Sequence, residues 1–339
     1  SLISITLAVQ NIDPLAALEL LQQEDSFQYF WEKPTDEFAI AAGTPLHKIT
    51  ASGKKRFEYI RRQIGHIKEN ACEYSSIDHR HAGIHFLGGF SFFDEVPARP
   101  WDSFGSGCFV IPEWQLTREG QLSLLTLNVS ASSFSSILEL EGTVRTKFLE
   151  ISGNLELDKD LQFKSNGKAK KYPPVAFDKE AYKAWEDSVT RAKNLISKEE
   201  FEKIVLGRKM EVELKNGLEP THIINALREQ YPGCYSFLIS LNGRKTFIGC
   251  TPERLVSFRK NYLLTEALAG SIKRGSTATE DAVLEKELLQ SSKNANEHNY
   301  VIKAIEQKLR PLVRNFEKGA KPVIKKLTNV QHLFTPITG

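Results

Sequence analysis

The sequence predicts an α+β protein with mostly antiparallel strand pairing. Apolar, strand-like runs come in adjacent pairs, and the clearest turn is Asn242-Gly243, which separates the runs at 234–241 and 245–250. Asn-Gly is a strong hairpin signal, and a hairpin joins antiparallel strands. Apolar residues also recur at helical spacing, as at 56–71, so helices accompany these hairpins. This pattern favours the α+β class over a doubly wound parallel sheet.

The first half of the chain mixes strands and helices and shows no pattern of catalytic chemistry. Asp13 and Pro14 suit the N-cap and the first position of a short helix. Two glycines lie at the centre of a predicted strand at 84–93. The other elements predicted here are an opening strand at 1–9, a hairpin over 27–42, a helix over 56–71 and two strands over 108–129.

The second half is more regular. Asp178 caps a predicted helix that runs to about Ile196, and a strand that carries Lys203 follows and reaches Leu214. Three parts are therefore expected: an N-terminal α+β scaffold at 1–164, a basic, polar linker at 165–177 and a catalytic region at 178–339. The further predicted elements are a helix from Pro220 to about Tyr231, hairpins over 234–250 and 254–269, and helices over 280–289 and 292–312.

Composition excludes several classes of protein. A net charge of +3 over 339 residues does not indicate a polyanionic partner, so no nucleic acid is expected. No apolar run reaches transmembrane length and the opening residues lack a basic start, so neither a membrane nor a signal peptide is expected. The four cysteines lack Cys-x-x-Cys spacing, which favours reduced thiols in the cytoplasm. His79, His81 and His85 cluster loosely, but no carboxylate or cysteine pattern supports a metal site there.

Lys203 lies in an unusual place for a lysine, within the apolar run Phe201–Met210. A strand has a side-chain period of two, so Lys203 shares a face with Val205 while Ile204 points to the other side. Because both faces are apolar, the strand is predicted to be buried on both sides. Desolvation favours the neutral form of a lysine, which is then a usable base. The alternative is an edge-strand lysine whose ammonium reaches solvent.

Two strand ends offer further polar groups. Glu253 follows a proline at the corner between two apolar strands, where a carboxylate is a plausible acid. Taken alone, this motif is better explained by a surface turn in which Glu253 meets solvent or pairs with a neighbour such as Arg254. Gly270 and Ser271 end an apolar strand, and a glycine there permits close approach of the backbone to a ligand. Backbone N–H groups at this position are able to bind a carboxylate.

The helix that begins near Ser292 carries a candidate metal ligand. Glu297 and His298 each lie one turn before an apolar residue of the helix, so both are predicted to point along its buried face. A carboxylate there needs a cation, a donor or a metal. Mg²⁺ is held by one or two carboxylates plus ligand oxygens, which makes Glu297 a candidate ligand. The alternative is a partly exposed glutamate favoured by the helix dipole.

Five motifs occur together and in order along the chain. They are Lys203 in Lys-Ile-Val-Leu-Gly-Arg, Glu253 in Gly-Cys-Thr-Pro-Glu-Arg-Leu, Leu268-Ala-Gly-Ser271, Glu297 in Lys-Asn-Ala-Asn-Glu-His and His332 in Val-Gln-His-Leu. As a set they are specific, and with them the chain resembles the chorismate-utilising enzymes, isochorismate synthases most closely. The resemblance implies the fold of anthranilate synthase component I, with large, mostly antiparallel sheets and helices packed on the outside.

The resemblance also implies roles for these residues. An isochorismate synthase moves a hydroxyl of chorismate from C4 to C2, which requires a base for the attacking water and an acid for the leaving hydroxyl. By resemblance Lys203 is the base, Glu253 the acid and Glu297 a ligand of Mg²⁺. The backbone at Ala269, Gly270 and Ser271 approaches the substrate carboxylates, and His332 lines the pocket. The protein is expected to act as a monomer in the cytoplasm, or in the plastid stroma for a plant-type source.

The lysine separates the members of this family. Ammonia-using anthranilate and aminodeoxychorismate synthases typically lack it, so Lys203 favours water as the nucleophile. Isochorismate synthase is therefore expected, with salicylate synthase, an anthranilate-synthase-like enzyme or an inactive chorismate-binding relative as alternatives. In the family the core continues beyond the position of Gly339, with a second metal carboxylate and an arginine that grips substrate. Little activity is accordingly expected from residues 1–339 alone.

Overall fold

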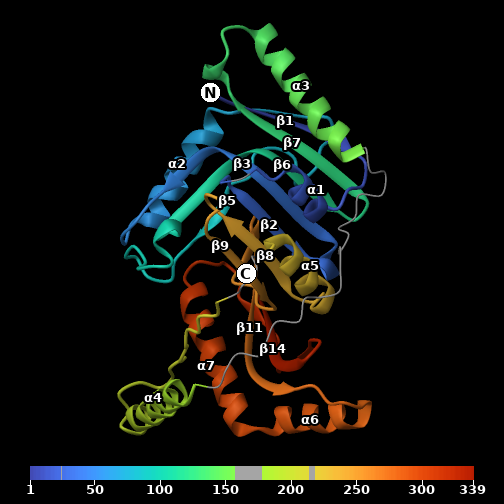
Figure 1. Ribbon diagram of the computed structural model, residues 1–339. Coiled ribbons are helices and arrows are strands. Elements are labelled where there is room, and N and C mark those ends of the chain that lie inside the picture. The colour runs from blue at the N-terminus through green and yellow to red at the C-terminus, as the bar shows by residue number, and fades with distance from the viewer. Residues whose placement is uncertain (24, 157–177, 214–217) are drawn as a thin grey trace. The chain divides into compact units, whose positions relative to one another are not determined.

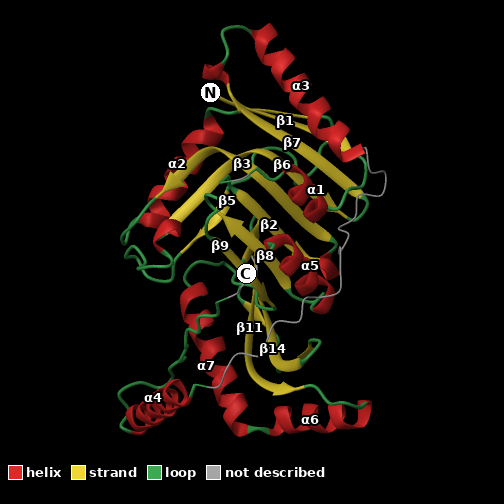
Figure 2. Ribbon diagram, viewed as in Figure 1, coloured by secondary structure: helices red, strands yellow, loops and turns green. Residues whose placement is uncertain are grey.

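The computed structural model describes residues 1–23, 25–156, 178–213 and 218–339. They form two compact units (Figures 1 and 2). The first comprises Ser1–Ser165 and Glu219–Glu253, and the second comprises Asn166–Leu218 and Arg254–Gly339. The predicted α+β class is confirmed, because every described strand pair is antiparallel except that of the first and fourth strands.

The first unit is built on one large sheet. Its described strands follow the order β4-β1-β7-β6-β3-β2-β8-β9, and β5 pairs with β6. Helices α1 (Pro14–Leu21), α2 (Arg56–Glu69), α3 (Ile137–Glu156) and α5 (Pro220–Gln230) accompany this sheet. The strands are β1 (Leu2–Val9), β2 (Gln28–Lys33), β3 (Phe38–Thr50), β4 (Cys72–Ser75), β5 (Leu87–Phe90), β6 (Gly107–Glu119), β7 (Leu122–Ser130), β8 (Tyr235–Ser240) and β9 (Thr246–Thr251).

Both faces of this sheet bury side chains. Along β3, Ala41 joins a core cluster with α1, α3 and α5, whereas Ile40 and Ala42 join a second cluster with Phe27 and Val110. This alternation follows from the two-residue period of a strand. Because the central strands are covered on both sides, long stretches such as Ala39–Ala42 are apolar without alternation.

Residues 219–253 belong to the first unit, which differs from the expected division at 165–177. Strand β8 pairs with β2, with Phe30 opposite Leu238, and so extends the sheet built by the first half of the chain. The hairpin β8–β9 predicted from Asn242-Gly243 is present. Its sheet partner lies about two hundred residues earlier in the sequence, and local patterns carry no information on such a pairing. The predicted linker at 165–177 lies outside the described residues.

A buried cluster of charges holds this returning segment. Arg228 of α5 donates two hydrogen bonds to the carboxylate of Asp13, at 2.9 and 2.6 Å, and a third to Glu32 of β2 at 3.1 Å. Arg118 of β6 also donates to Glu32, at 3.0 Å. Asp13 in addition caps α1 by accepting from the amide of Leu15. One guanidinium therefore links the start of α1, the sheet and α5.

The protonation of this cluster reflects burial and pairing. Burial opposes ionisation of Asp13, but the guanidinium of Arg228 outweighs it and holds the pKa of that carboxyl below its usual value. For Glu32 burial prevails and raises the pKa, although Arg228 and Arg118 oppose the rise. Burial alone lowers the pKa of Arg228, whereas its bonds to both carboxylates raise it overall. The cluster therefore stabilises the fold most when Asp13 is ionised.

The second unit contains a smaller antiparallel sheet. Its described strands follow the order β10-β11-β14-β12, and β13 also pairs with β14. Helix α7 packs on β11 and β14 through Ile302, Ala267 and Ile337. The strands are β10 (Ser257–Arg259), β11 (Tyr262–Lys273), β12 (Glu317–Lys318), β13 (Val323–Lys326) and β14 (Val330–Thr338), and the helices are α4 (Lys179–Ser197), α6 (Ala278–Gln290) and α7 (Ser292–Leu309).

The predicted strand around Lys203 is wrong. Residues 201–213 form no strand, and 45% of Ile204 and 82% of Val205 are exposed. The prediction assumed neighbours on both faces, but no strand in the described ranges pairs with this segment. An extended segment without a partner strand leaves its backbone groups to water. The predicted strand at 84–93 is likewise shorter, because only Leu87–Phe90 pairs with β6.

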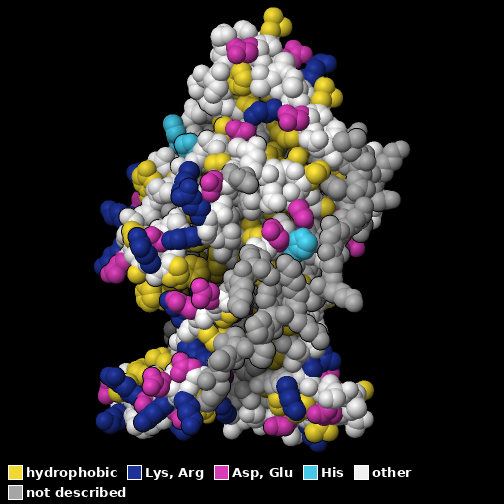
Figure 3. Space-filling view, in the orientation of Figure 1, with side chains coloured by type: hydrophobic (Ala, Val, Ile, Leu, Met, Phe, Trp, Pro, Cys, Tyr) yellow, Lys and Arg dark blue, Asp and Glu magenta, His cyan; other side chains and the backbone are white. Residues whose placement is uncertain are grey.

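The surface fits the modest net charge of the chain. On the face shown in Figure 3, acidic and basic side chains are interspersed, among them those of α4 and α6. None of the helices in the described ranges combines the length and apolarity needed to cross a membrane.

The charge cluster makes a prediction about stability. Arg228→Met should lower the free energy of unfolding by about 3–5 kcal/mol, because it leaves two buried carboxylates without their shared partner. Arg145→Met is the matched control: its pair with Glu141, at 3.4 Å, is exposed and should contribute at most about 1 kcal/mol. Urea unfolding at pH 7 measures both. Equal losses in the two variants would contradict a special role for Arg228.

Candidate active site

Strand β11 contains a bulge at residues 269–270. The pairing with β14 runs from Leu268 opposite Phe334 directly to Ser271 opposite His332. Three steps along β11 therefore match two along β14, which is one residue too many for a regular ladder. A bulge of this kind leaves the extra residue unpaired and bends the strand.

Gly270 is required at this bulge for two reasons. Its φ of +82° lies in the left-handed region that residues with a side chain rarely adopt. A Cβ at this position would also lie 3.2 Å from Asn294 of α7 and from Leu333 of β14. The backbone at 269–271 is therefore packed closely against the first turn of α7.

Helix α7 presents two successive polar residues to different surroundings. Its N-cap is Ser291, whose hydroxyl accepts from the amide of Asn294 at 3.3 Å. His298 is completely buried, whereas 41% of the Glu297 side chain is exposed. The prediction that both residues point along the buried face is confirmed for His298 and wrong for Glu297, because consecutive helical residues are about 100° apart.

The ring of His298 joins both central strands of the second unit. Its Nδ1 lies 3.0 Å from the carbonyl oxygen of Ala269 and its Nε2 lies 2.8 Å from Thr335 Oγ1. A carbonyl oxygen only accepts, so Nδ1 carries the proton and donates. Burial lowers the pKa of His298, although the bond to Ala269 opposes the shift. The neutral ring therefore accepts from the Thr335 hydroxyl at Nε2.

Lys203 contacts Glu297. The Nζ atom lies 3.5 Å from Oε1 of the carboxylate, and 30% of the lysine side chain is exposed. The structure thus joins the predicted base and the predicted metal ligand, which are 94 residues apart in the sequence. The desolvation on which a neutral Lys203 was predicted is incomplete, because the surrounding segment is not a buried strand.

The predicted substrate-binding residues also lie together. Ser271 and His332 face each other across β11 and β14, with 2.8 Å between Oγ and Nδ1. Burial lowers the pKa of His332, and the ammonium of Lys325 adds to this shift. The neutral imidazole of His332 and the hydroxyl of the exposed residue Ser271, next to the buried bulge, offer donors and acceptors for a polar ligand.

Glu253 occupies a different setting. It follows β9 as the last residue of the first unit, is exposed, and its amide donates to Thr251 Oγ1 at 3.3 Å. The expectation of a buried carboxyl group at this position is therefore not met. Lys203, Glu297, the bulge and His332 all belong to the second unit.

The described residues fit a magnesium ion only if substrate oxygens and water complete its coordination. Over the described ranges no group of three or more histidine, cysteine, aspartate or glutamate side chains is placed to hold a metal. Glu297 nevertheless has an accessible carboxylate with a cationic neighbour, Lys203. Mg²⁺ commonly takes one or two carboxylates and completes its coordination with substrate oxygens and water. Glu297 fits that pattern, whereas the loose histidine cluster does not, since His79 pairs with Glu119 at 3.2 Å.

Two neighbours of the site were not predicted from sequence. Thr335 binds His298, and Lys325 lies 3.0 Å from the buried carboxylate of Glu266. Both depend on β13 and β14, which the sequence interpretation did not include. Burial alternates along Val330–Thr338 as in a half-buried strand, but the buried side includes Gln331 and Thr335. The sequence therefore shows no clear alternation of apolar and polar residues there.

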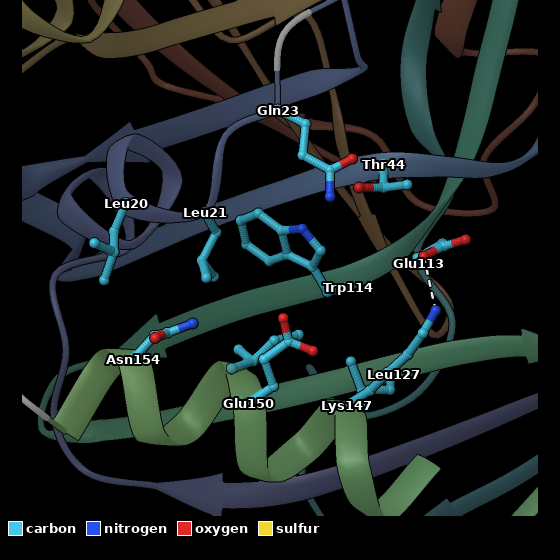
Figure 4. A pocket seen from close by; sticks show the side chains of 11 residues that line it. Leu20, Leu21, Gln23, Thr44, Glu113, Trp114, Leu127, Lys147, Glu150 and Asn154 are labelled. Atoms are coloured by element: carbon cyan, nitrogen blue, oxygen red, sulfur yellow. Dashed lines mark hydrogen bonds and ion pairs between the residues drawn. The ribbon is translucent and has the colours of Figure 1, made fainter. Parts of the chain in front are cut away.

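The first unit has a separate cavity of about 260 Å³. Figure 4 shows it between Trp114 of β6 and the side chains of α3. Lys147 bridges to Glu113 at 2.9 Å at its margin. None of the predicted site residues lines it. The lining residues are Leu20, Leu21, Gln23, Thr44, Glu113, Trp114, Leu127, Lys147, Glu150, Ile151 and Asn154.

Several curated proteins are similar to this chain. The isochorismate synthase MenF of Bacillus subtilis is 28% identical over all of this chain and 71% of its own length. The salicylate biosynthesis isochorismate synthase of Pseudomonas aeruginosa is 30% identical, over 96% of this chain and 66% of its own length. The chain therefore spans about two thirds or slightly more of each of these relatives.

Solved structures share the fold at lower identity. The menaquinone-specific isochorismate synthase MenF of Escherichia coli matches all of this chain and 70% of its own, with a TM-score of 0.68 and 20% identity. Anthranilate synthase component I of Streptococcus pneumoniae matches 89% of this chain and 68% of its own, with a TM-score of 0.57 and 16% identity. The family model described as chorismate binding enzyme matches residues 1–339. The chain belongs to the chorismate-binding enzyme family.

Proposed function

We propose that this chain provides the chorismate-binding site of an isochorismate synthase, which converts chorismate to isochorismate. Membership of the family makes chorismate the substrate, and the two curated relatives bear the name isochorismate synthase. The observation that carries the proposal is the β11 bulge, which brings Ser271 to His332 while α7 beside it presents Glu297 to Lys203.

The reaction needs one proton removed and one proton supplied. Water forms a bond to C2 of the ring as Lys203 accepts its proton, both double bonds of the ring diene shift, and the C4–oxygen bond breaks. Glu253 protonates the departing hydroxyl, which leaves as water, so the product is an isomer of the substrate. Each proton transfer contributes typically about 10²–10⁴-fold to the rate. Lys203 must be unprotonated to accept, so it must leave the carboxylate of Glu297 first.

Binding of the substrate follows from its two carboxylates. The backbone N–H groups at the bulge and the Ser271 hydroxyl are donors suited to a carboxylate. Glu297 would hold Mg²⁺, which when bound neutralises negative charge of the substrate. The residues of the second unit thus bind and orient the ring, and the proton transfers fall to Lys203 and Glu253.

The proposal predicts the effect of removing Lys203. In the full-length protein with Mg²⁺, Lys203→Ala should lower the turnover of chorismate by about 10²–10⁴-fold while chorismate still binds. Lys209→Ala is the control from the same segment, because Lys209 pairs only locally with Glu211 and should leave turnover unchanged. Chromatographic separation of the products follows the reaction.

Four results would contradict this assignment. Unchanged turnover in Lys203→Ala would exclude Lys203 as the catalytic base. Salicylate and pyruvate as the main products would indicate a salicylate synthase, and an absolute need for ammonia would indicate an anthranilate-synthase-like enzyme. Wild-type protein that binds chorismate without converting it would favour an inactive binding relative.

A variant that removes the charge of Glu297 tests its proposed role as a Mg²⁺ ligand. Glu297→Gln should raise the Mg²⁺ concentration needed for half-maximal activity by about tenfold or more, because it removes a charged ligand from a hard cation. Glu306→Gln on the same helix is the control, since Glu306 contacts Arg310 and Lys318. Mn²⁺ binding measured by electron paramagnetic resonance gives an independent readout. Equal Mn²⁺ affinity in the two variants would show that Glu297 is not a metal ligand.

A further inference from the structure

We infer that His298 is a positioning residue, which fixes the bulge at Ala269–Ser271 and thereby the substrate-binding backbone next to Glu297. The inference rests on the proposed function for its meaning in catalysis, and on the contacts of one buried ring for its geometry. The ring lies between α7, β11 and β14, and it is completely buried.

The bulge creates the need for such a residue. The regular pairing between β11 and β14 is interrupted at 269–270. The carbonyl oxygen of Ala269 therefore needs a hydrogen-bond donor from outside the ladder. A buried carbonyl without a hydrogen bond is unfavourable. His298 Nδ1 supplies this donor at 3.0 Å. The bond therefore holds the peptide between Ala269 and Gly270, whose orientation decides where the Gly270 N–H points.

The second bond fixes the ring itself. Thr335 Oγ1 lies 2.8 Å from Nε2. Because Nδ1 of the neutral ring donates to the Ala269 carbonyl, Nε2 carries no proton and accepts from the Thr335 hydroxyl. A ring that makes both bonds cannot turn over without losing them. The Ala269 carbonyl thus sets which nitrogen carries the proton, and the bond to Thr335 holds the ring in that orientation.

The adjacent position of Glu297 extends the effect to the proposed metal ligand. Because His298 and Glu297 are consecutive in α7, a ring that is pinned to two strands also holds the backbone from which Glu297 projects. Ile302, one turn later on the same face, packs on Ala267 and Ile337 without hydrogen bonds from its side chain. It anchors the helix by packing alone and so provides a matched comparison.

The test uses four variants of the full-length protein. His298→Leu loses both bonds, Thr335→Val loses only the bond at Nε2, and His298→Asn keeps an N–H near Nδ1. Ile302→Ala is the packing control. In His298→Leu we expect the KM for chorismate to rise about tenfold or more and Mn²⁺ affinity to fall, since small displacements of positioning groups have large effects. His298→Asn should restore most of the wild-type KM and Mn²⁺ affinity. Ile302→Ala should lower the melting temperature without changing the KM or the Mn²⁺ affinity.

A readout without substrate separates this inference from the proposed function. In ¹⁵N nuclear magnetic resonance spectra, wild-type His298 should show a protonated Nδ1 and an unprotonated Nε2. His298→Leu should shift the amide signals of Gly270 and Ser271, and His298→Asn should return them toward wild type. If these shifts occur but the wild type does not convert chorismate, the proposed function fails while the positioning role stands.

Two outcomes would overturn the inference. The first is unchanged Gly270 and Ser271 amide signals in His298→Leu. The second is an equal rise in KM in His298→Leu and in Ile302→Ala at matched loss of melting temperature, which would show that His298 acts through packing alone.

Discussion

The extra residue in β11 is the constraint on which the candidate site depends. It takes the carbonyl of Ala269 out of the ladder, and burial then requires a donor for that oxygen. His298 is the donor, and its position on α7 places Glu297 one residue earlier, where it meets Lys203. The same bulge requires glycine at 270 because of the positive φ and the closeness of Asn294. One irregular step in a strand thus links the backbone, the helix and the charged pair.

The first unit depends on a comparable polar contact. Arg228 satisfies the buried carboxylates of Asp13 and Glu32, and it attaches the returning segment 219–253 to strands made by the first half of the chain. Hydrophobic packing supplies most of the driving force for such a sheet, but it specifies partners poorly. Directional, charged hydrogen bonds that are costly to break add that specificity here.

The sequence predicted those features that depend on neighbouring residues. Asn242-Gly243 identified a hairpin that is present, and the helical spacing before Ile302 identified α7 and the buried side of His298. The buried strand at Lys203 was wrong because burial on both faces depends on partners remote in sequence. The pairing of Lys203 with Glu297 was not predicted for the same reason. The resemblance placed Ser271 and His332 in one pocket, and the register of β14, which local patterns did not supply, shows their contact.

The central claim is that the bulge of β11 and the start of α7 form one chorismate-binding site. A crystal structure of the full-length protein with chorismate and Mg²⁺ tests it most directly. The account predicts a substrate carboxylate within hydrogen-bonding distance of the Gly270 or Ser271 amide, a cation on Glu297, and Lys203 released from that carboxylate toward the ring. Chorismate bound elsewhere, with the Lys203–Glu297 pair intact and no contact to the bulge, would contradict it.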